Sequence, residues 1–183
     1  MVNALDSVQA HSPDFVTLLG ETYTESGRTL LDVVDERPTL MVFLRHFGCP
    51  FCRQALDDVA RIESELTRRG IHAVFVHLGT PERAKPYFDY YKLSHVERVS
   101  NPDGSLYGHP LFHLKRTNLF QLIRPSVWIK QLVGIIRDHG IGLVREDVFQ
   151  MPGVFFLRDR AIVSFYRSRT IDDRPDYLAL TAK

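Results

Sequence analysis

The sequence is poor in cysteine and in long apolar runs, and each shortage excludes a class of protein. With only two cysteines among 183 residues, the chain is not a small secreted domain held together by disulfides. No run of about 18 apolar residues occurs, so the sequence offers no candidate membrane span. Its first residues lack the basic and apolar regions of a secretory signal. We therefore expect a cytoplasmic protein with no membrane partner.

The sequence also has no excess of acidic or basic residues. The 23 Lys and Arg residues nearly balance the 22 Asp and Glu residues, for a formal net charge of +1. Such a balance gives no electrostatic reason to bind nucleic acid or an anionic membrane. What is present is the mixture of a soluble globular protein, 44% hydrophobic and 25% charged. The length corresponds to about one domain, which we place over residues 1–183.

Both cysteines belong to one Cys-x-x-Cys motif, Cys49–Cys52, at a predicted junction between a strand and a helix. The apolar run Leu40–Leu44 predicts a strand buried on both faces. After the motif, apolar residues recur every three or four positions as far as Arg69, which predicts an amphipathic helix. Cys49 thus falls near the helix N-cap, where unpaired N–H groups and the helix dipole stabilise a thiolate. Pro50 suits the first helical position because it has no N–H to leave unpaired.

The rest of the chain predicts an α/β arrangement around this junction. A second apolar strand, Ile71–Leu78, should run parallel to the first through a right-handed crossover. We expect Thr80 and Pro81 to open a helix that Pro86 interrupts or kinks early. The remaining predicted elements are a short edge strand at His95–Ser100, a hairpin of Val154–Leu157 and Ala161–Tyr166, and a closing helix over 173–181.

Two segments outside this core carry expectations of their own. Thr24–Arg28 has the composition of a turn that joins two short strands, and Leu30–Val34 should pack on the main body. An amphipathic helix from Ser126 to His139 presents a broad apolar face. Burial within this domain is one interpretation of that face, and a shared surface in a homodimer is the other. Its residues include Trp128, Leu132 and Ile136.

The order of these elements resembles the thioredoxin fold over most of residues 22–181. The string FLRHFGCPFCR at Phe43–Arg53 is similar to that of peroxiredoxin-like, selenoprotein-L-related proteins of the alkyl hydroperoxide reductase/thiol-specific antioxidant superfamily. The segments Val154–Arg160 and Tyr166–Arg169 look like the closing strands of that group. The resemblance implies a mixed central sheet flanked by helices, with a peroxiredoxin-type insertion and an N-terminal extension bearing a strand pair. It also implies an antioxidant oxidoreductase.

The motif also departs from related patterns. Typical peroxiredoxins carry Pro-x-x-x-Thr-x-x-Cys, and alignment on Cys52 puts Arg45 at the Pro position and Cys49 at the Thr position. The Cys-Pro-Phe-Cys string also looks like the Cys-Pro-Tyr-Cys of glutaredoxins. Their Thr-Val-Pro is replaced here by Gln150–Pro152. The thioredoxin fold places a cis-proline against the motif, so Pro152 is either that residue or an ordinary residue at the start of a strand.

Two thiols spaced in this way can close a disulfide with little rearrangement. We expect an exposed Cys49 thiolate to attack a peroxide or a disulfide, and a deeper Cys52 to resolve the product. Arg45, His46 and Arg53 are candidates for lowering the Cys49 pKa further, although a solvated charge is the alternative for each. Thioredoxin or glutathione is the expected reductant, and no cofactor is expected.

Two other readings stay open. A lone Cys-x-x-Cys can be half of a zinc site, with His46 as a third ligand, although the proline at a helix start favours redox chemistry. The chain could instead be a non-catalytic thioredoxin-like module that senses redox state or binds a partner.

Overall fold

A mixed five-stranded sheet forms the centre of the protein in the computed structural model, which describes residues 13–117, 146–170 and 173–182. The strand order is β3-β2-β1-β4-β5. Strands β1, β2 and β3 are parallel, whereas β4 pairs antiparallel with both β1 and β5. The predicted mixed sheet is thereby confirmed. The strands are β1 (Thr39–Phe43), β2 (His72–His77), β3 (Glu97–Ser100), β4 (Gly153–Arg158) and β5 (Ala161–Arg167).

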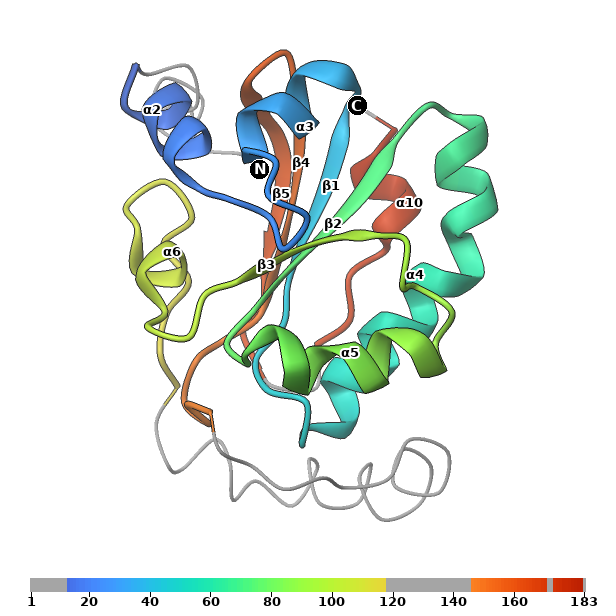
Figure 1. Ribbon diagram of the computed structural model, residues 1–183, viewed down its shortest axis with the longest axis vertical. Coiled ribbons are helices and arrows are strands. Elements are labelled where there is room, and N and C mark those ends of the chain that lie inside the picture. Colours follow the sequence, from blue (N-terminus) through green and yellow to red (C-terminus); the bar gives the residue numbers. More distant parts are fainter. Residues whose placement is uncertain (1–12, 118–145, 171–172, 183) are drawn as a thin grey trace.

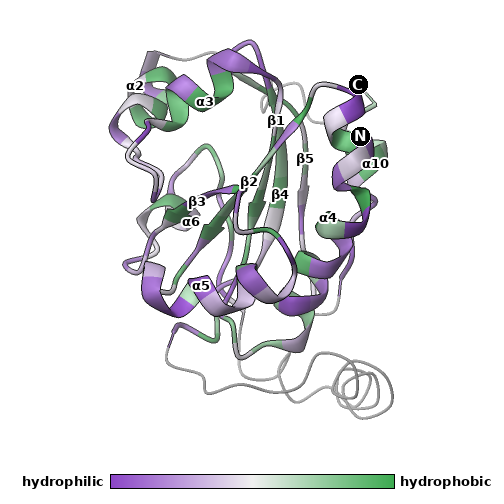
Figure 2. Ribbon diagram, turned by 45° about the vertical axis from the view of Figure 1, so that its right-hand side comes forward, coloured by the Kyte–Doolittle hydropathy of each residue, from purple (hydrophilic) through white to green (hydrophobic). Residues whose placement is uncertain are grey.

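Helices cover both faces of the sheet (Figure 1). The alternation of strand side chains explains why, because Leu40 and Val42 point into one hydrophobic cluster while Met41 and Phe43 point into the other. Figure 2 shows apolar strands at the centre and polar residues along the outer helices. One face carries α4 (Pro50–Arg68), α5 (Pro81–Tyr90) and α10 (Tyr177–Leu180), and the other carries α2 (Pro13–Glu21), α3 (Leu30–Glu36) and α6 (Ser105–Gly108).

The predicted strands and the crossover helix are confirmed, with small differences at their ends. The structure places β1 and β2 within a residue of the predicted runs, parallel and joined by α4. The predicted edge strand is β3, which lies at one edge of the sheet, and the hairpin is β4 and β5. Among the described residues, no helix has the length and apolar character to span a membrane.

The expected strand pair of the N-terminal extension is wrong for the described residues. From residue 13 onward the extension has helices α2 and α3, and its strand pairing is limited to a single bridge between Tyr23 and Thr29. Thr29 caps α3: its side chain accepts from the N–H of Asp32, and the Asp32 carboxylate accepts from the N–H of Thr29. This capping box starts a helix and so ends the strand pairing after one bridge.

Two further expectations need correction. Pro86 does not interrupt α5, which continues to Tyr90, whereas the alternative of a kink at Pro86 stays a prediction. Glu82, whose carbonyl Pro86 leaves unpaired, is exposed to water. The closing helix is far shorter than 173–181, because Asp176 caps it and only Tyr177–Leu180 is helical. The predicted helix with Trp128, Leu132 and Ile136 lies outside the described residues.

Candidate active site

The cysteine motif lies where β1 gives way to α4, as the sequence predicts. Cys49 is the N-cap of α4, with extended backbone angles, and Pro50 opens the helix. The N–H groups of Cys52 and Arg53 donate to the Cys49 carbonyl at 3.1 and 3.2 Å. The sulfur of Cys49 therefore stands at the positive end of a 19-residue helix.

The two thiols are close together and both are buried. Cys49 and Cys52 lie 4.0 Å apart, and both are free. Their exposed fractions are 4% and 3%, so the expectation of an exposed Cys49 is wrong. His46 and Phe47, in the loop before the motif, are buried as well. A disulfide needs a sulfur separation of about 2 Å, which a modest movement of the side chains provides.

The surroundings push the pKa values of the two thiols apart. A hydrogen bond from the Cys52 side chain lowers the pKa of Cys49 to about 6 against the opposing effect of burial, with help from the Arg45 charge. Burial, followed by the neighbouring Cys49, raises the pKa of Cys52 well above its usual range. The pair is thus arranged as a thiolate at Cys49 and a neutral thiol at Cys52.

Arg45 is the basic side chain that contacts the pair. It is almost fully buried, and its guanidinium reaches the Cys49 sulfur at 3.7 Å. The guanidinium also donates to the carbonyls of Gln150, at 2.8 Å, and of Val148. The backbone N–H of Arg45 donates to the Cys52 sulfur at 3.3 Å. One residue thus contacts both sulfurs through different groups.

The other two basic candidates do not contribute positive charge at the thiol. His46 is buried, and burial together with the charges of Arg45 and Arg83 lowers its pKa to about 4, so the ring is neutral near pH 7. Arg53 points elsewhere: it donates to the Phe47 carbonyl at 2.8 Å and lies over the Tyr87 ring at 4.9 Å. Arg53 therefore holds the loop that precedes the motif.

Pro152 lies beside the motif without a cis bond. No peptide bond of the described residues is cis, so Pro152 is an ordinary residue before β4. Gly153 pairs with Phe43, which brings Pro152 next to the end of β1. Together with Arg45 and Cys52 it lines a small cavity of about 40 Å³.

Tyr107 is a site residue that sequence reasoning missed. Its hydroxyl donates to the carbonyl of Leu44 and, at 3.0 Å, to that of Val76, so it joins the ends of β1 and β2 beneath the motif. Burial and the nearby Cys52 raise the Tyr107 pKa well above its usual range, which keeps the phenol neutral. No local pattern marks this tyrosine, because its position depends on the packing of α6.

The structure also tests the alternative that the cysteine motif is part of a zinc site. Among residues 13–117, 146–170 and 173–182, no three His, Cys, Asp or Glu side chains gather closely enough to hold a metal ion. His46 does not complete such a group with the two cysteines. Its Nδ1 atom is buried without a hydrogen-bond partner in the described part of the chain.

Comparison with known proteins identifies the fold. No family model matches the chain, and no curated protein sequence does. Solved structures match it at 12–16% identity, over 69–98% of their own length. Peroxiredoxin Q from Xanthomonas campestris is 16% identical, with 97% of this chain and 98% of that chain covered and a TM-score of 0.64.

Two further structures come from Mycobacterium tuberculosis. The peroxidoxin BcpB is 14% identical, and the match covers 82% of this chain and 82% of that chain with a TM-score of 0.57. A secreted disulfide oxidoreductase homologous to DsbE of E. coli is 12% identical, covers 92% of this chain and 96% of its own, and has a TM-score of 0.53. The chain therefore has the thioredoxin-like fold, in the form shared with peroxiredoxins, as the sequence predicts.

Proposed function

We propose that this protein is a thiol–disulfide oxidoreductase that cycles Cys49 and Cys52 between a dithiol and a disulfide. The observation that carries the proposal is the geometry of the pair: two free thiols 4.0 Å apart, with the Arg45 guanidinium 3.7 Å from the Cys49 sulfur. A cation beside one thiol and a helix N-terminus behind it favour the thiolate, which is the nucleophile in thiol chemistry. The fold shared with peroxiredoxins and DsbE-like oxidoreductases supports the same class of reaction.

With a peroxide, the reaction has two steps. The Cys49 thiolate attacks one oxygen of the O–O bond, which forms a sulfenic acid and releases an alcohol or water after the departing oxygen takes up a proton. The Cys52 thiol then attacks the Cys49 sulfur, an S–S bond forms, and the hydroxyl leaves as water with the Cys52 proton. The two cysteines lose two electrons in all, and the peroxide gains them.

The burial of the site favours a peroxide over a bulky disulfide as the oxidant. The Cys49 sulfur is covered, and the described cavity beside Cys52 holds only about 40 Å³. A hydrogen peroxide or small organic hydroperoxide needs far less room than a folded protein carrying a disulfide. A disulfide substrate would require the buried Cys49 sulfur to become exposed first.

Each supporting residue has a proposed role in this cycle. Arg45 stabilises the thiolate, while Pro50 starts the helix without adding an unpaired N–H. Arg53 holds the loop before the motif through the Phe47 carbonyl. The neutral His46 is buried in the loop before the motif, and Pro152 lines the small cavity beside Cys52.

A reductant must return the disulfide to the dithiol. Thioredoxin or glutathione is the proposed donor of two electrons through thiol–disulfide exchange, in a cytoplasmic setting. A homodimer stays a proposal that rests on the apolar pattern at Trp128, Leu132 and Ile136.

The burial of both thiols also favours a second function, a redox-sensing module that is oxidised once and reduced slowly. Steady-state oxidation of NADPH, with hydrogen peroxide and either a thioredoxin or a glutathione recycling system, separates the two. Many turnovers per protein, abolished in Cys49→Ser, support the oxidoreductase. Oxidation that stops after one equivalent supports the sensor.

A further inference from the structure

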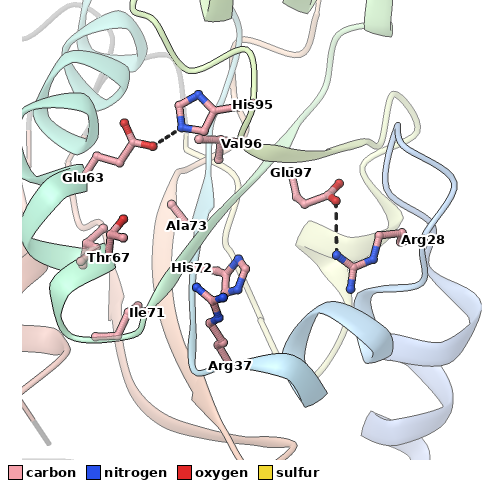
Figure 3. Close-up of a pocket in the computed structure, with 11 residues that line it drawn as sticks. Arg28, Arg37, Glu63, Thr67, Ile71, His72, Ala73, His95, Val96 and Glu97 are labelled. Atoms are coloured by element: carbon pink, nitrogen blue, oxygen red, sulfur yellow. Dashed lines mark hydrogen bonds and ion pairs between the residues drawn. The ribbon is translucent and has the colours of Figure 1, made fainter.

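A second cavity lies at the opposite end of the sheet from the cysteines. It has a volume of about 310 Å³ and is lined around the first residues of β2 (Figure 3). Because β1 and β2 are parallel, their amino ends share one edge of the sheet, and the cysteines follow the carboxyl end of β1. A five-residue strand separates the two sites by about 15 Å. The cavity is therefore distinct from the proposed redox site.

Two polar side chains in this cavity lack partners. The Nε2 atom of His72 is buried and has no hydrogen-bond partner among the described residues. Arg37, which is exposed, makes no ion pair with any residue in the described part of the chain. Figure 3 labels both side chains among the residues that line the cavity, and the Arg37 charge acts on the His72 ring. A buried nitrogen without a partner costs free energy that a ligand could recover.

The other charges of the cavity are already matched. His95 contacts Glu63, and Arg28 lies 2.7 Å from Glu36 and 3.8 Å from Glu97. Both acidic side chains of the lining, Glu63 and Glu97, thus have basic partners. The free hydrogen-bonding capacity is concentrated on Arg37 and His72.

The pairing of β1 with β2 brings Arg37 and His72 together. Thr39 pairs with His72, and the His72 N–H donates to the Pro38 carbonyl at 2.9 Å. Arg37 directly precedes Pro38, so its position relative to the imidazole is set by the sheet. Burial and the Arg37 charge lower the His72 pKa, so the ring is neutral near pH 7 and one nitrogen carries a proton that it can donate.

Besides Thr67 and the charged and histidine side chains, the lining of the cavity has four apolar residues. Leu66 and Ile71 are buried, and Ala73 and Val96 are half-buried, and all four line the cavity. Sites for small molecules begin at about 300 Å³, so this cavity suits a compact ligand. A planar guanidinium matches a carboxylate through two parallel hydrogen bonds.

We propose that this cavity binds a small carboxylate with a compact apolar body. The carboxylate accepts from the Arg37 guanidinium and from the His72 ring, and the apolar body lies against Leu66 and Ile71. The proposal is independent of the redox function.

Benzoate is the probe, titrated into the full chain while the imidazole C–H resonances of His72 are followed by NMR, with His72→Gln used for assignment. We expect a saturable shift of the His72 resonances. Benzamide, which has the same body without the charge, should bind at least tenfold more weakly. Inorganic phosphate, which has charge without an apolar body, should also bind at least tenfold more weakly.

The variant Arg37→Gln removes the guanidinium from an exposed position and should weaken benzoate binding at least tenfold. The control Arg61→Gln removes an exposed arginine of α4 that does not line the cavity, and it should bind benzoate as the original chain does. Absence of a saturable shift would overturn the proposal, as would equal binding by Arg37→Gln. Equal binding of benzamide or phosphate would overturn the assigned ligand class.

Discussion

Arg45 and Gln150, which are 105 residues apart in the sequence, are joined by a 2.8 Å hydrogen bond from the guanidinium to the backbone carbonyl. The bond ties the segment before β4 to the loop after β1, and it orients the guanidinium toward the Cys49 sulfur. The charge beside the proposed nucleophile is therefore fixed by a distant part of the chain. A planar side chain with several donors is needed for these simultaneous contacts.

Replacement of Arg45 tests its effect on the thiolate. In Arg45→Met the charge is lost, so the Cys49 pKa should rise from about 6 toward the ordinary thiol value. At pH 7 the thiolate then becomes the minor form, and the rate of alkylation by iodoacetamide should fall about tenfold. The pH dependence of alkylation measures the change.

Arg53→Met is the matched comparison, because it removes an arginine near the motif that does not face the thiol. It should leave the midpoint of the alkylation profile in place. An equal shift in both variants would show that general positive potential, and not the contact of Arg45, sets the Cys49 pKa. Circular dichroism should show that both variants are folded.

The largest influence on the Cys49 pKa, the hydrogen bond from Cys52, is tested by two substitutions. Cys52→Ser keeps a donor of similar size, whereas Cys52→Ala removes it. The alkylation midpoint of Cys49 should therefore rise more in Cys52→Ala than in Cys52→Ser. Equal midpoints would argue against this hydrogen bond. In Cys49→Ser, Cys52 should react slowly at pH 6, because its pKa is raised.

The buried His46 should make the protein less stable in acid. Its pKa is about 4 when folded, below the ordinary value of 6.5, so the unfolded chain binds a proton between these values and the folded chain does not. Stability is then lost as the pH falls from 6.5 to 4, by up to about 3 kcal/mol. Urea unfolding at several pH values should show a smaller loss in His46→Gln.

Gly153 should be intolerant of a side chain. A Cβ atom there would lie 2.5 Å from Leu114 Cδ2 and 3.1 Å from the Tyr166 carbonyl. Gly153→Ala should therefore destabilise the protein by about 1–3 kcal/mol, measured by urea unfolding. Gly108→Ala is the control, because a Cβ at that glycine meets nothing within 4 Å. Similar losses in both variants would contradict the close packing at the start of β4.

Local patterns predict most of the fold and the position of the motif. The buried run at β1, followed by a Cys-Pro pair and a helical period, is enough to place Cys49 at the N-cap of α4. The prediction of a strand pair before β1 is wrong, although the sequence contains a signal for a helix start. Thr29 and Asp32 have the spacing of a capping box. That signal favours a helix in a run whose apolar pattern alone fits a strand.

The choice among the basic residues could not be made from the sequence. Arg45 and Arg53 each lie four residues from Cys49 along the chain. Hydrogen bonds to the carbonyls of Val148 and Gln150 hold the Arg45 side chain in the interior. Tyr107 reaches the site from α6 for the same kind of reason. Contacts of this kind form between segments that are far apart in the sequence, so no local sequence pattern predicts them.

The central claim is that Cys49 and Cys52 form a redox couple in which Cys49 reacts first. Mass spectrometry after one equivalent of hydrogen peroxide tests it most directly, with a sulfenic-acid trap added to Cys52→Ser. The account predicts loss of two hydrogen atoms and a Cys49–Cys52 disulfide in the original chain, and trapped sulfenic acid on Cys49 in the variant. Two thiols that stay reduced, or sulfenic acid that forms first on Cys52, would contradict it.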